Sequence, residues 1–199
     1  MKIHQSFYAN KVLEKFNHTN CSSVYIPADP GIKLVAANSK ANEKFYPYRE
    51  AIGSLMYLAV CTRPDLAYIV GVQSRYMENP DTTHWQGIKR VFKYLKGSID
   101  RGITYKINSQ DATFSMYCDS DWGGDNDTRK STSGWIGFIN GGPVTWTSRK
   151  QTVIATSTTD AEFVALCSAT KMVMCTRKLL QEIGETQEAA TSMYWPFLL

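Results

Sequence analysis

The sequence predicts a mixed α+β protein, in which a helical N-terminal half precedes a sheet and one long helix. Three observations support this prediction. Apolar residues recur at the spacing of a buried helical stripe through much of residues 6–96. From residue 112 the pattern changes to short strand-like runs around an Asn-Gly turn. Residues 160–183 then return to a helical period.

Four helices are predicted in the N-terminal half. The first lies within residues 6–16, and a polar, proline-containing connection over residues 20–47 separates it from the second, at residues 48–61. The third begins with Thr62 as a candidate N-cap and with Pro64 in its first turn, where a missing N–H costs little.

The fourth predicted helix covers residues 83–96 and is amphipathic. Basic residues lie mainly between its apolar positions, so its exposed side is positive. Gly97 occupies the position of a left-handed C-terminal cap, and residues 102–107 form a short strand candidate. The apolar stripe consists of Trp85, Ile88, Val91, Phe92 and Leu95.

The second half is predicted to form a strand, a hairpin and a helix. A strand is predicted at residues 113–119, and two more at residues 134–140 and 143–148 flank the Asn-Gly turn. The helix at residues 160–183 should turn one side toward the sheet. The residues predicted on that side are Phe163, Leu166, Cys167, Thr170, Val173, Met174 and Leu180.

The net charge of +4 is too small to indicate a nucleic-acid partner by itself, but its distribution is uneven. Residues 84–106 contain six Lys or Arg residues and one acid, Asp100, and a second basic cluster flanks the predicted hairpin. Such patches suit phosphate contacts, while solvated helix faces account for most basic runs, and the sequence leaves both interpretations open. The candidate nucleic-acid-binding residues are Lys89, Arg90, Lys93, Lys96, Arg129 and Lys130.

Four acids, Asp119, Asp121, Asp125 and Asp127, fall within nine positions at the end of the first predicted strand. They would repel one another unless water or a cation separated them. An EF-hand calcium loop is excluded, because counting from Asp119 puts Lys130 where a bidentate Glu is required. A magnesium site needs fewer carboxylates, usually from separate elements.

Glu162 is the best partner for Asp119 elsewhere in the chain. It stands in the first turn of the predicted long helix, where a second interpretation competes. Residues 159–162, Thr-Asp-Ala-Glu, match a capping box in which Glu162 would reach back to its own N-cap at Thr159. The spacing alone favours the cap over a metal ligand.

Other features narrow the class of protein. The five cysteines include no CxxC pair, which favours buried free thiols over a zinc site or a disulfide framework. The three histidines show no ligand spacing.

The longest apolar run, at residues 55–61, is far shorter than the roughly 20 residues of a membrane span, and the N-terminus lacks a secretory signal. We therefore expect an intracellular chain without a membrane partner, either cytoplasmic or nuclear.

Several motifs carry a family resemblance. The stretch "YREAIGSLMYLAVCTRPDLAYIV" resembles the segment after the polymerase core in copia-type LTR retrotransposon Pol polyproteins. The stretches "YCDSDWGGD", "KSTSGWIGFINGGPVTWTSRKQ" and "STTDAEFVAL" are similar to the ribonuclease H domain that follows it. The resemblance covers nearly all of residues 4–194. It implies a thumb- or connection-like reverse transcriptase segment at residues 1–108 and a truncated ribonuclease H-like domain at residues 109–199.

The resemblance also implies a site and a chemistry. In that family a mixed sheet with flanking helices holds two magnesium ions, and the motif match places the first Asp on Asp119 and the Glu on Glu162. Two metals about 4 Å apart activate a water and stabilise the leaving 3′ oxygen of RNA in an RNA–DNA hybrid. Asp119 and Glu162 are therefore the predicted catalytic and metal-binding residues, with Mg²⁺ as the cofactor.

The match breaks after Tyr194. Pro196 stands where the third acid is expected, and the fourth ligand and the closing strand and helix are missing. We expect residues 195–199 to be an out-of-frame or truncated end, which makes Mg²⁺ binding by this chain doubtful. Asp121 or Asp160 could supply a substitute carboxylate. No Asp-Asp dipeptide occurs, so the polymerase motif should lie upstream of Met1 in a parent protein.

Three functional hypotheses remain. The chain is an inactive fragment of a Pol polyprotein, whose partners would be an RNA–DNA hybrid and the upstream polymerase part. Alternatively, it is a non-catalytic nucleic-acid-binding module, or an interaction or pseudogene product without a nucleic-acid role. In each case an exposed sheet edge would invite self-association.

Overall fold

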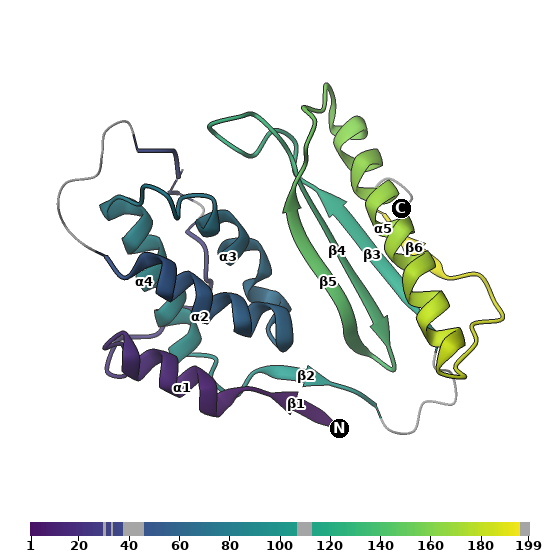
Figure 1. The fold of residues 1–199 in the computed structure, drawn as a ribbon, viewed down its shortest axis with the longest axis horizontal. Helices are drawn as coiled ribbons and strands as arrows, with labels where there is room; N and C mark the ends of the chain where they lie inside the picture. The colour runs from purple at the N-terminus through teal and green to yellow at the C-terminus, as the bar shows by residue number, and fades with distance from the viewer. Residues whose placement is uncertain (30, 33, 38–45, 107–112, 196–199) are drawn as a thin grey trace. The chain divides into compact units, whose positions relative to one another are not determined.

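The computed structural model describes residues 1–199 except 30, 33, 38–45, 107–112 and 196–199. The chain divides into two compact units, each described here by itself (Figure 1). The helical unit is Ile3–Ile103, and the sheet unit is Thr104–Leu199 together with Met1–Lys2. The predicted boundary between residues 108 and 109 lies outside the described residues. No helix in the described part of the chain is long and apolar enough to cross a membrane.

The helical unit packs its helices around one core, and two short strands pair as a separate small sheet. Phe16 and Phe92 stack at the centre of this core, with 5.0 Å between ring centroids. The first half is mainly helical, as predicted. The elements are β1 (Lys2–His4), α1 (Ser6–Lys15), α2 (Tyr48–Cys61), η1 (Pro64–Leu66), α3 (Ala67–Ser74), α4 (Thr82–Lys96) and β2 (Gly102–Thr104).

The start of α4 is a reciprocal capping box. The Asp81 carboxylate accepts a hydrogen bond from the His84 backbone N–H, and His84 Nδ1 accepts one from the Asp81 backbone N–H, both at 3.0 Å. The left-handed cap predicted at Gly97 is wrong, because its φ is −77°. Glycine is needed there for close approach instead, since a Cβ would lie 2.8 Å from Ser23 Cβ.

The predicted N-cap at Thr62 is also wrong. Thr62 follows the last residue of α2, and its hydroxyl donates to Gln5 Oε1 at 2.7 Å. Pro64 then opens the 3-10 turn η1, which leads into α3 without a side-chain cap. A tertiary partner for the hydroxyl thus replaces the local cap that the spacing indicates.

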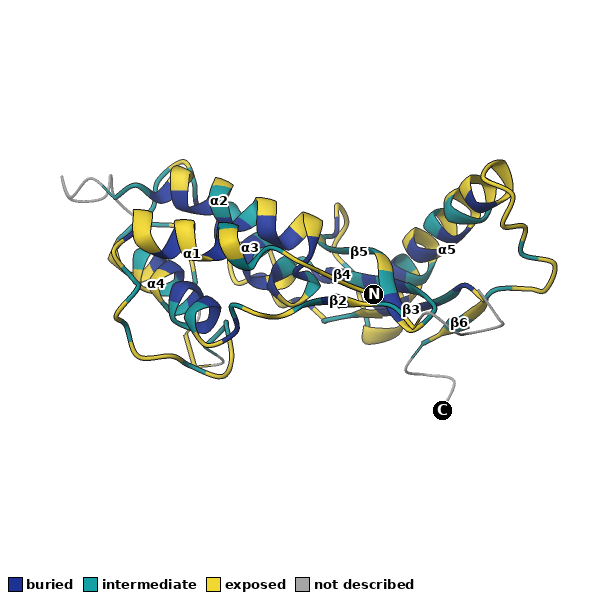
Figure 2. Cartoon of the chain, turned by 90° about the horizontal axis from the view of Figure 1, so that it is seen from below, coloured by how far each residue is buried: buried dark blue, intermediate teal, exposed yellow. Residues whose placement is uncertain are grey.

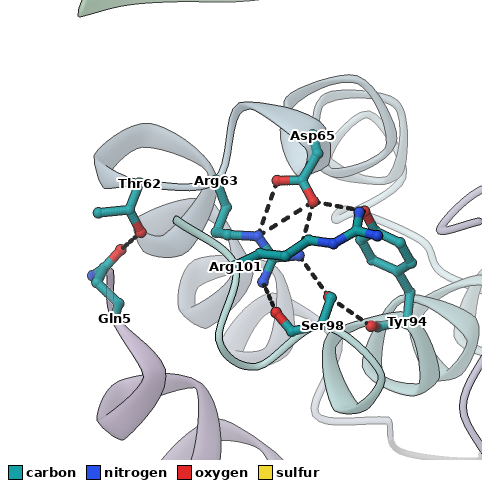
Figure 3. A network of polar contacts seen from close by, with 7 residues as sticks. All are labelled: Gln5, Thr62, Arg63, Asp65, Tyr94, Ser98 and Arg101. Carbon is teal, nitrogen blue, oxygen red and sulfur yellow. Dashed lines mark hydrogen bonds and ion pairs between the residues drawn. The ribbon is translucent and has the colours of Figure 1, made fainter. Parts of the chain in front are cut away.

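Arg63 ties the η1 turn to the end of α4 (Figure 3). Its side chain is 2% exposed, and its guanidinium donates to both oxygens of Asp65 and, at 3.0 Å, to the Ser98 carbonyl. The Tyr94 hydroxyl donates to Asp65 at 2.7 Å and accepts from Arg101 at 2.7 Å. Burial alone would raise the pKa of Asp65, but the hydrogen bonds from Arg63 and Tyr94 hold it below its ordinary value.

The sheet unit has a four-stranded mixed sheet in the order β5-β4-β3-β6. Strand β4 pairs antiparallel with both β3 and β5, whereas β6 runs parallel to β3. A helix packs on one face of this sheet, and β5 and β6 are its edges among the described strands. The elements are β3 (Ser115–Ser120), β4 (Thr132–Ile139), β5 (Gly142–Lys150), α5 (Thr158–Glu182) and β6 (Ser192–Tyr194).

The hairpin between β4 and β5 forms as predicted. Asn140 and Gly141 both adopt the left-handed conformation, with φ values of 52° and 74°. Two successive left-handed residues define a type I′ turn, which matches the twist of the flanking strands. The register of the central strands therefore follows from a signal that is local in the sequence.

The side of α5 that faces the sheet differs from the prediction. Phe163 and Met174, predicted on the inner side, are 60% and 68% exposed, and Cys167 and Thr170 are exposed as well. Buried and exposed stripes alternate along the helix in Figure 2. Alanines make up half of the buried residues of α5 and let the helix approach the strands closely. The buried residues of α5 are Ala161, Glu162, Ala165, Ala169, Val173 and Leu180.

The acidic loop between β3 and β4 is organised by Asp125. This side chain is buried and accepts hydrogen bonds from the Thr128 backbone at 2.8 Å and from Lys150 Nζ at 3.2 Å. Burial would raise the pKa of Asp125, but the bonds from Thr128 and Lys150 lower it to about 2. Asp121 accepts from the Thr132 backbone N–H. Both acids thus have structural roles in the loop.

All five cysteines are free, as predicted, but burial holds only for some. Cys118 is buried and Cys21 is half-buried, while Cys61, Cys167 and Cys175 are exposed. Cys167 and Cys175 are exposed positions of α5, and of these two only Cys167 belongs to the side that was predicted to face the sheet.

Replacing Arg63 with Met should lower the free energy of unfolding by about 3 kcal/mol. The substitution leaves Asp65 without its buried cation and Ser98 without its donor. Urea unfolding followed by circular dichroism measures the change. The control is Lys15→Met, which removes an ion pair whose two side chains are 50% and 55% exposed, and it should cost less than about 1 kcal/mol. Equal losses in the two variants would contradict this prediction.

In the Asp125→Asn variant, the free energy of unfolding should depend less steeply on pH below pH 4 than in the wild type. Because the folded-state pKa of Asp125, about 2, lies below the ordinary value of 3.8, its contribution is present above pH 4 and is lost as the pH falls toward 2. Urea midpoints measured from pH 6 to pH 2 should therefore fall less steeply in the variant. Asp127→Asn, at an exposed position of the same loop, should keep the wild-type slope.

Candidate functional site

Asp119 lies near the end of β3, on the face of the sheet opposite the core. Met116 and Cys118 point into the core, while Tyr117 and Asp119 are exposed, as the two-residue period of a strand requires. The Ser120 backbone N–H donates to Asp119 Oδ1 at 2.8 Å. The strand therefore presents this carboxylate at its C-terminal end.

Glu162 is the fifth residue of α5, and the capping box predicted for it is wrong. The helix begins at Thr158 with Ser157 as its N-cap, two residues earlier than the pattern indicates, and the Ser157 hydroxyl accepts from the Asp160 backbone N–H at 3.1 Å. Asp160 bonds to the Thr156 hydroxyl. Glu162 is thus left without a capping role and is only 6% exposed.

Gln151 fixes the N-terminal end of α5 against the sheet. Its side-chain amide donates to Ser133 Oγ at 2.9 Å on β4 and to the Ala161 carbonyl at 2.8 Å in the helix. The residue is buried at 6% exposure. Gln151 therefore positions the turn that carries Glu162, and the sequence contains no local pattern that indicates this role.

The structure brings Asp119 and Glu162 together. The Ser120 backbone nitrogen lies 2.8 Å from Asp119 Oδ1 and 3.4 Å from Glu162 Oε1, so both carboxyl groups converge on the same N–H. Burial raises the pKa of Glu162, and the hydrogen bond and negative charge of Asp119 raise it further, against the lowering effect of donors from Trp195 and Ser120. Burial and the neighbouring acid therefore both disfavour the charged form of Glu162.

The second oxygen of Glu162 accepts a hydrogen bond from Trp195. The indole Nε1 lies 2.8 Å from Glu162 Oε2. Trp195 directly follows β6, whose parallel register pairs Tyr194 with Tyr117. Sequence reasoning missed this contact, because it depends on where β6 pairs and because residue 195 belongs to the segment after the family match breaks.

These residues do not fit a two-magnesium site by themselves. In the parts of the chain that the structure describes, no group of three or more His, Cys, Asp or Glu residues could hold a metal ion. The two candidate substitutes, Asp121 and Asp160, are bonded to Thr132 and Thr156 instead. Position 196, where the family's third acid is expected, lies outside the described residues.

The candidate nucleic-acid-binding residues fall in both units. Lys89, Lys93 and Lys96 follow one another at i, i+4 and i+7 on α4, so they share a face of the helix. Lys89 is exposed, and the other two are half-buried. Arg90 forms an ion pair with Asp29 at 3.0 Å, which offsets part of its charge.

The basic residues of the sheet unit lie in the loop before β4. Arg129 is exposed and adopts a left-handed φ of 57°, while Lys130 Nζ donates to the Thr152 carbonyl at 2.7 Å. Both remain available to the solvent at least in part. Lys130 is therefore held against the segment that precedes α5, and the Arg129 guanidinium lies beside Gly123 of the same loop.

Exposed aromatic rings accompany the carboxylate pair, and sequence reasoning did not single them out. Tyr117 and Tyr194 stack at 4.5 Å between centroids, on the sheet face that also presents Asp119. Trp122 is 54% exposed, and its indole donates to the Ala155 carbonyl at 3.2 Å. Strand alternation places Tyr117 beside Asp119, but the stack requires the long-range pairing of β6.

No family model and no solved structure matches the chain. Among curated proteins, it is 38% identical over 192 residues to the retrovirus-related Pol polyprotein from transposon TNT 1-94 of Nicotiana tabacum. That match covers 94% of this chain and 14% of the polyprotein. The corresponding polyprotein from transposon RE2 of Arabidopsis thaliana is 34% identical, over 92% of this chain and 12% of its own length.

A shorter relative is covered almost completely. The secreted RxLR effector protein 161 of Plasmopara viticola is 45% identical over 128 residues, which are 64% of this chain and 89% of that protein. The chain thus spans a small part of the polyproteins it matches and most of this effector. The polyprotein matches extend over nearly its whole length, and the chain therefore belongs to the family of copia-type retrotransposon Pol polyproteins.

Proposed function

We propose that the chain is a segment of a copia-type Pol polyprotein that contacts RNA–DNA hybrids, and that its Asp119–Glu162 pair is part of a ribonuclease H-type site. The observation that carries this proposal is the convergence of the two carboxyl groups from a strand end and a helix turn. Acids from separate elements converge in this way where catalysis requires them, since they otherwise repel. In a complete polyprotein the polymerase part would precede this segment.

The topology supports the assignment. The family resemblance implies a mixed sheet with flanking helices for a ribonuclease H-like fold. The order β5-β4-β3-β6, with β6 parallel to β3 after the α5 crossover, agrees with that expectation. The pair then lies at the strand end and helix start that the family resemblance indicates.

The surroundings of the pair suit a nucleic acid. Tyr117, Tyr194 and Trp122 expose π faces on which bases or sugars stack. Arg129 and Lys130, in the same unit as the pair, supply charges for phosphates. Independently of this site, Lys89, Lys93 and Lys96 on α4 give the helical unit a positive face of its own. Stacking surfaces beside a carboxylate pair favour a nucleic-acid substrate over a small neutral one.

The same geometry favours contact without cleavage by this chain alone. In two-metal hydrolysis, several carboxylates hold the two metal ions, and the ions stabilise the attacking and the leaving oxygen. The pair supplies two carboxyl groups, and no group of three or more potential ligands is found among the described residues. We therefore propose a binding segment whose catalytic competence depends on groups beyond the described pair.

Purified protein should not cleave an RNA–DNA hybrid above the level of its Asp119→Asn variant. The reason is the incomplete ligand set around the pair. The substrate is a fluorescently labelled RNA annealed to DNA, and a denaturing gel measures its cleavage. The protein is incubated with it in Mg²⁺ or Mn²⁺ at roughly 10 mM, an excess suited to weak sites. Magnesium-dependent cleavage that Asp119→Asn abolishes would refute the non-cleaving part of the proposal.

Hybrid binding should weaken steeply with salt and should depend on the α4 lysines. Changing Lys89, Lys93 and Lys96 to Gln should reduce the slope of log K against log salt by about three, one for each phosphate that a lysine no longer neutralises. Fluorescence anisotropy between low and moderate salt measures this slope.

The matched control changes Lys11, Lys171 and Lys178 to Gln, which alters net charge equally at exposed positions on other helices. This control should leave most of the slope in place. Equal effects of the two triple variants would show nonspecific attraction, and absent binding at low salt would remove the nucleic-acid role altogether.

A further inference from the structure

We propose that the Trp195 indole N–H closes the Asp119–Glu162 pair to divalent cations, so that Trp195 sets the cation affinity of this pair. The inference rests on the proposed assignment of the pair as ribonuclease H-type ligands. The inference accounts for a buried acid that lies beside a second acid without further metal ligands: a protein donor already occupies Glu162 Oε2, an oxygen that a cation would use.

The hydrogen bond from Trp195 to Glu162 is well formed. The distance of 2.8 Å between Trp195 Nε1 and Glu162 Oε2 is typical of an N–H bond to a carboxylate, whereas the 3.4 Å from Ser120 N to Oε1 is long. Indole nitrogen is a donor only and has no lone pair for a metal. Trp195 therefore stabilises the carboxylate without being able to serve as a ligand.

A cation at Glu162 Oε2 would meet the positive end of the indole N–H dipole. Binding would require the ring to turn away and leave a donor without its acceptor in a partly buried position. Both effects oppose the cation, although the neighbouring negative charge of Asp119 attracts it. The donor thus competes with the cation for the same oxygen.

Several contacts hold the indole in this place. Tyr194 pairs with Tyr117 across β3 and β6, and the two rings stack with their planes within 15°. The Cys118 thiol lies 3.9 Å from the Tyr194 carbonyl. Trp195 itself packs against the buried cluster that contains Cys118 and Trp135. The indole N–H is therefore directed at Glu162 by the strand pairing and by the core.

Trp122 offers a matched control in the same unit. Its indole also donates a hydrogen bond, but the acceptor is the Ala155 backbone carbonyl at 3.2 Å. Replacing either tryptophan with Phe removes an N–H donor and keeps an aromatic ring. Only Trp195→Phe removes a donor from Glu162.

The test is Mn²⁺ binding to the full chain, measured by the decrease of the free Mn²⁺ signal in electron paramagnetic resonance. Trp195→Phe should bind Mn²⁺ about tenfold more tightly than wild type, the effect of removing one competing hydrogen bond. Trp122→Phe should match wild type. Adding Glu162→Gln to Trp195→Phe should abolish the gain. Binding by Trp195→Phe that is no tighter than wild type, or undetectable in both, overturns the proposal.

A second measurement uses native Trp195 and so does not depend on the folding of its variant. The Trp195 Nε1–H resonance in a ¹⁵N correlation spectrum should shift in Glu162→Gln, and its exchange with water should accelerate. Glu182→Gln, at the other end of α5, should leave it unchanged. A resonance that does not respond to Glu162→Gln overturns the proposal.

These readouts are separate from those of the proposed function. Hybrid binding and cleavage report on the nucleic-acid role, whereas Mn²⁺ affinity and the indole resonance report on the Trp195–Glu162 hydrogen bond. Absence of hybrid binding with the expected Mn²⁺ gain would reject the proposed function and support this inference. Salt-dependent hybrid binding without any Mn²⁺ gain would do the reverse.

Discussion

Close packing of α5 against the sheet is the constraint on which the candidate site depends. Ala161, Ala165 and Ala169 are fully buried on the inner side of the helix. Because alanine adds little bulk, the helix backbone lies near the strands, and Glu162 is carried to the Ser120 backbone. Two carboxyl groups do not attract each other when ionised, so packing rather than charge must hold them together. A larger residue on this inner face would push the helix outward and separate them.

Arg63 and Glu162 are buried charged residues with opposite kinds of partner. In the helical unit, Arg63 has an acid and two oxygens of Ser98 as partners, and Asp65 is correspondingly stabilised in its ionised form. In the sheet unit, Glu162 has another acid as its neighbour and is shifted toward its neutral form. Full compensation is the arrangement of a structural ion pair. A like-charge contact is costly to stability and is typical of a functional position.

Much of the fold followed from local patterns, and the errors have a common cause. The Asn140-Gly141 turn and the helix at residues 48–61 were predictable, because turn chemistry and apolar period act over a few residues. The inner face of α5 was not, since the prediction weighted large apolar residues such as Phe163 while the sheet accommodates alanines. Thr62 and Glu162 were predicted to cap helices, but each forms a hydrogen bond with a residue far away in the sequence instead: Thr62 with Gln5 and Glu162 with Trp195.

Although it indicated neither β1 nor β6, the sequence by itself determined the order of the four helices, the hairpin and the long helix, the family and the identity of the two candidate acids. It could do so because those properties reside in short motifs and in residue type. Only the tertiary structure showed that Glu162 has no capping role and lies close to Asp119. It also showed that Glu162 accepts a hydrogen bond from the indole N–H of Trp195, which is 33 residues away along the chain. The physical reason is that side-chain partners depend on how β6 and α5 pack on β3, and packing is set by the whole unit rather than by neighbouring residues.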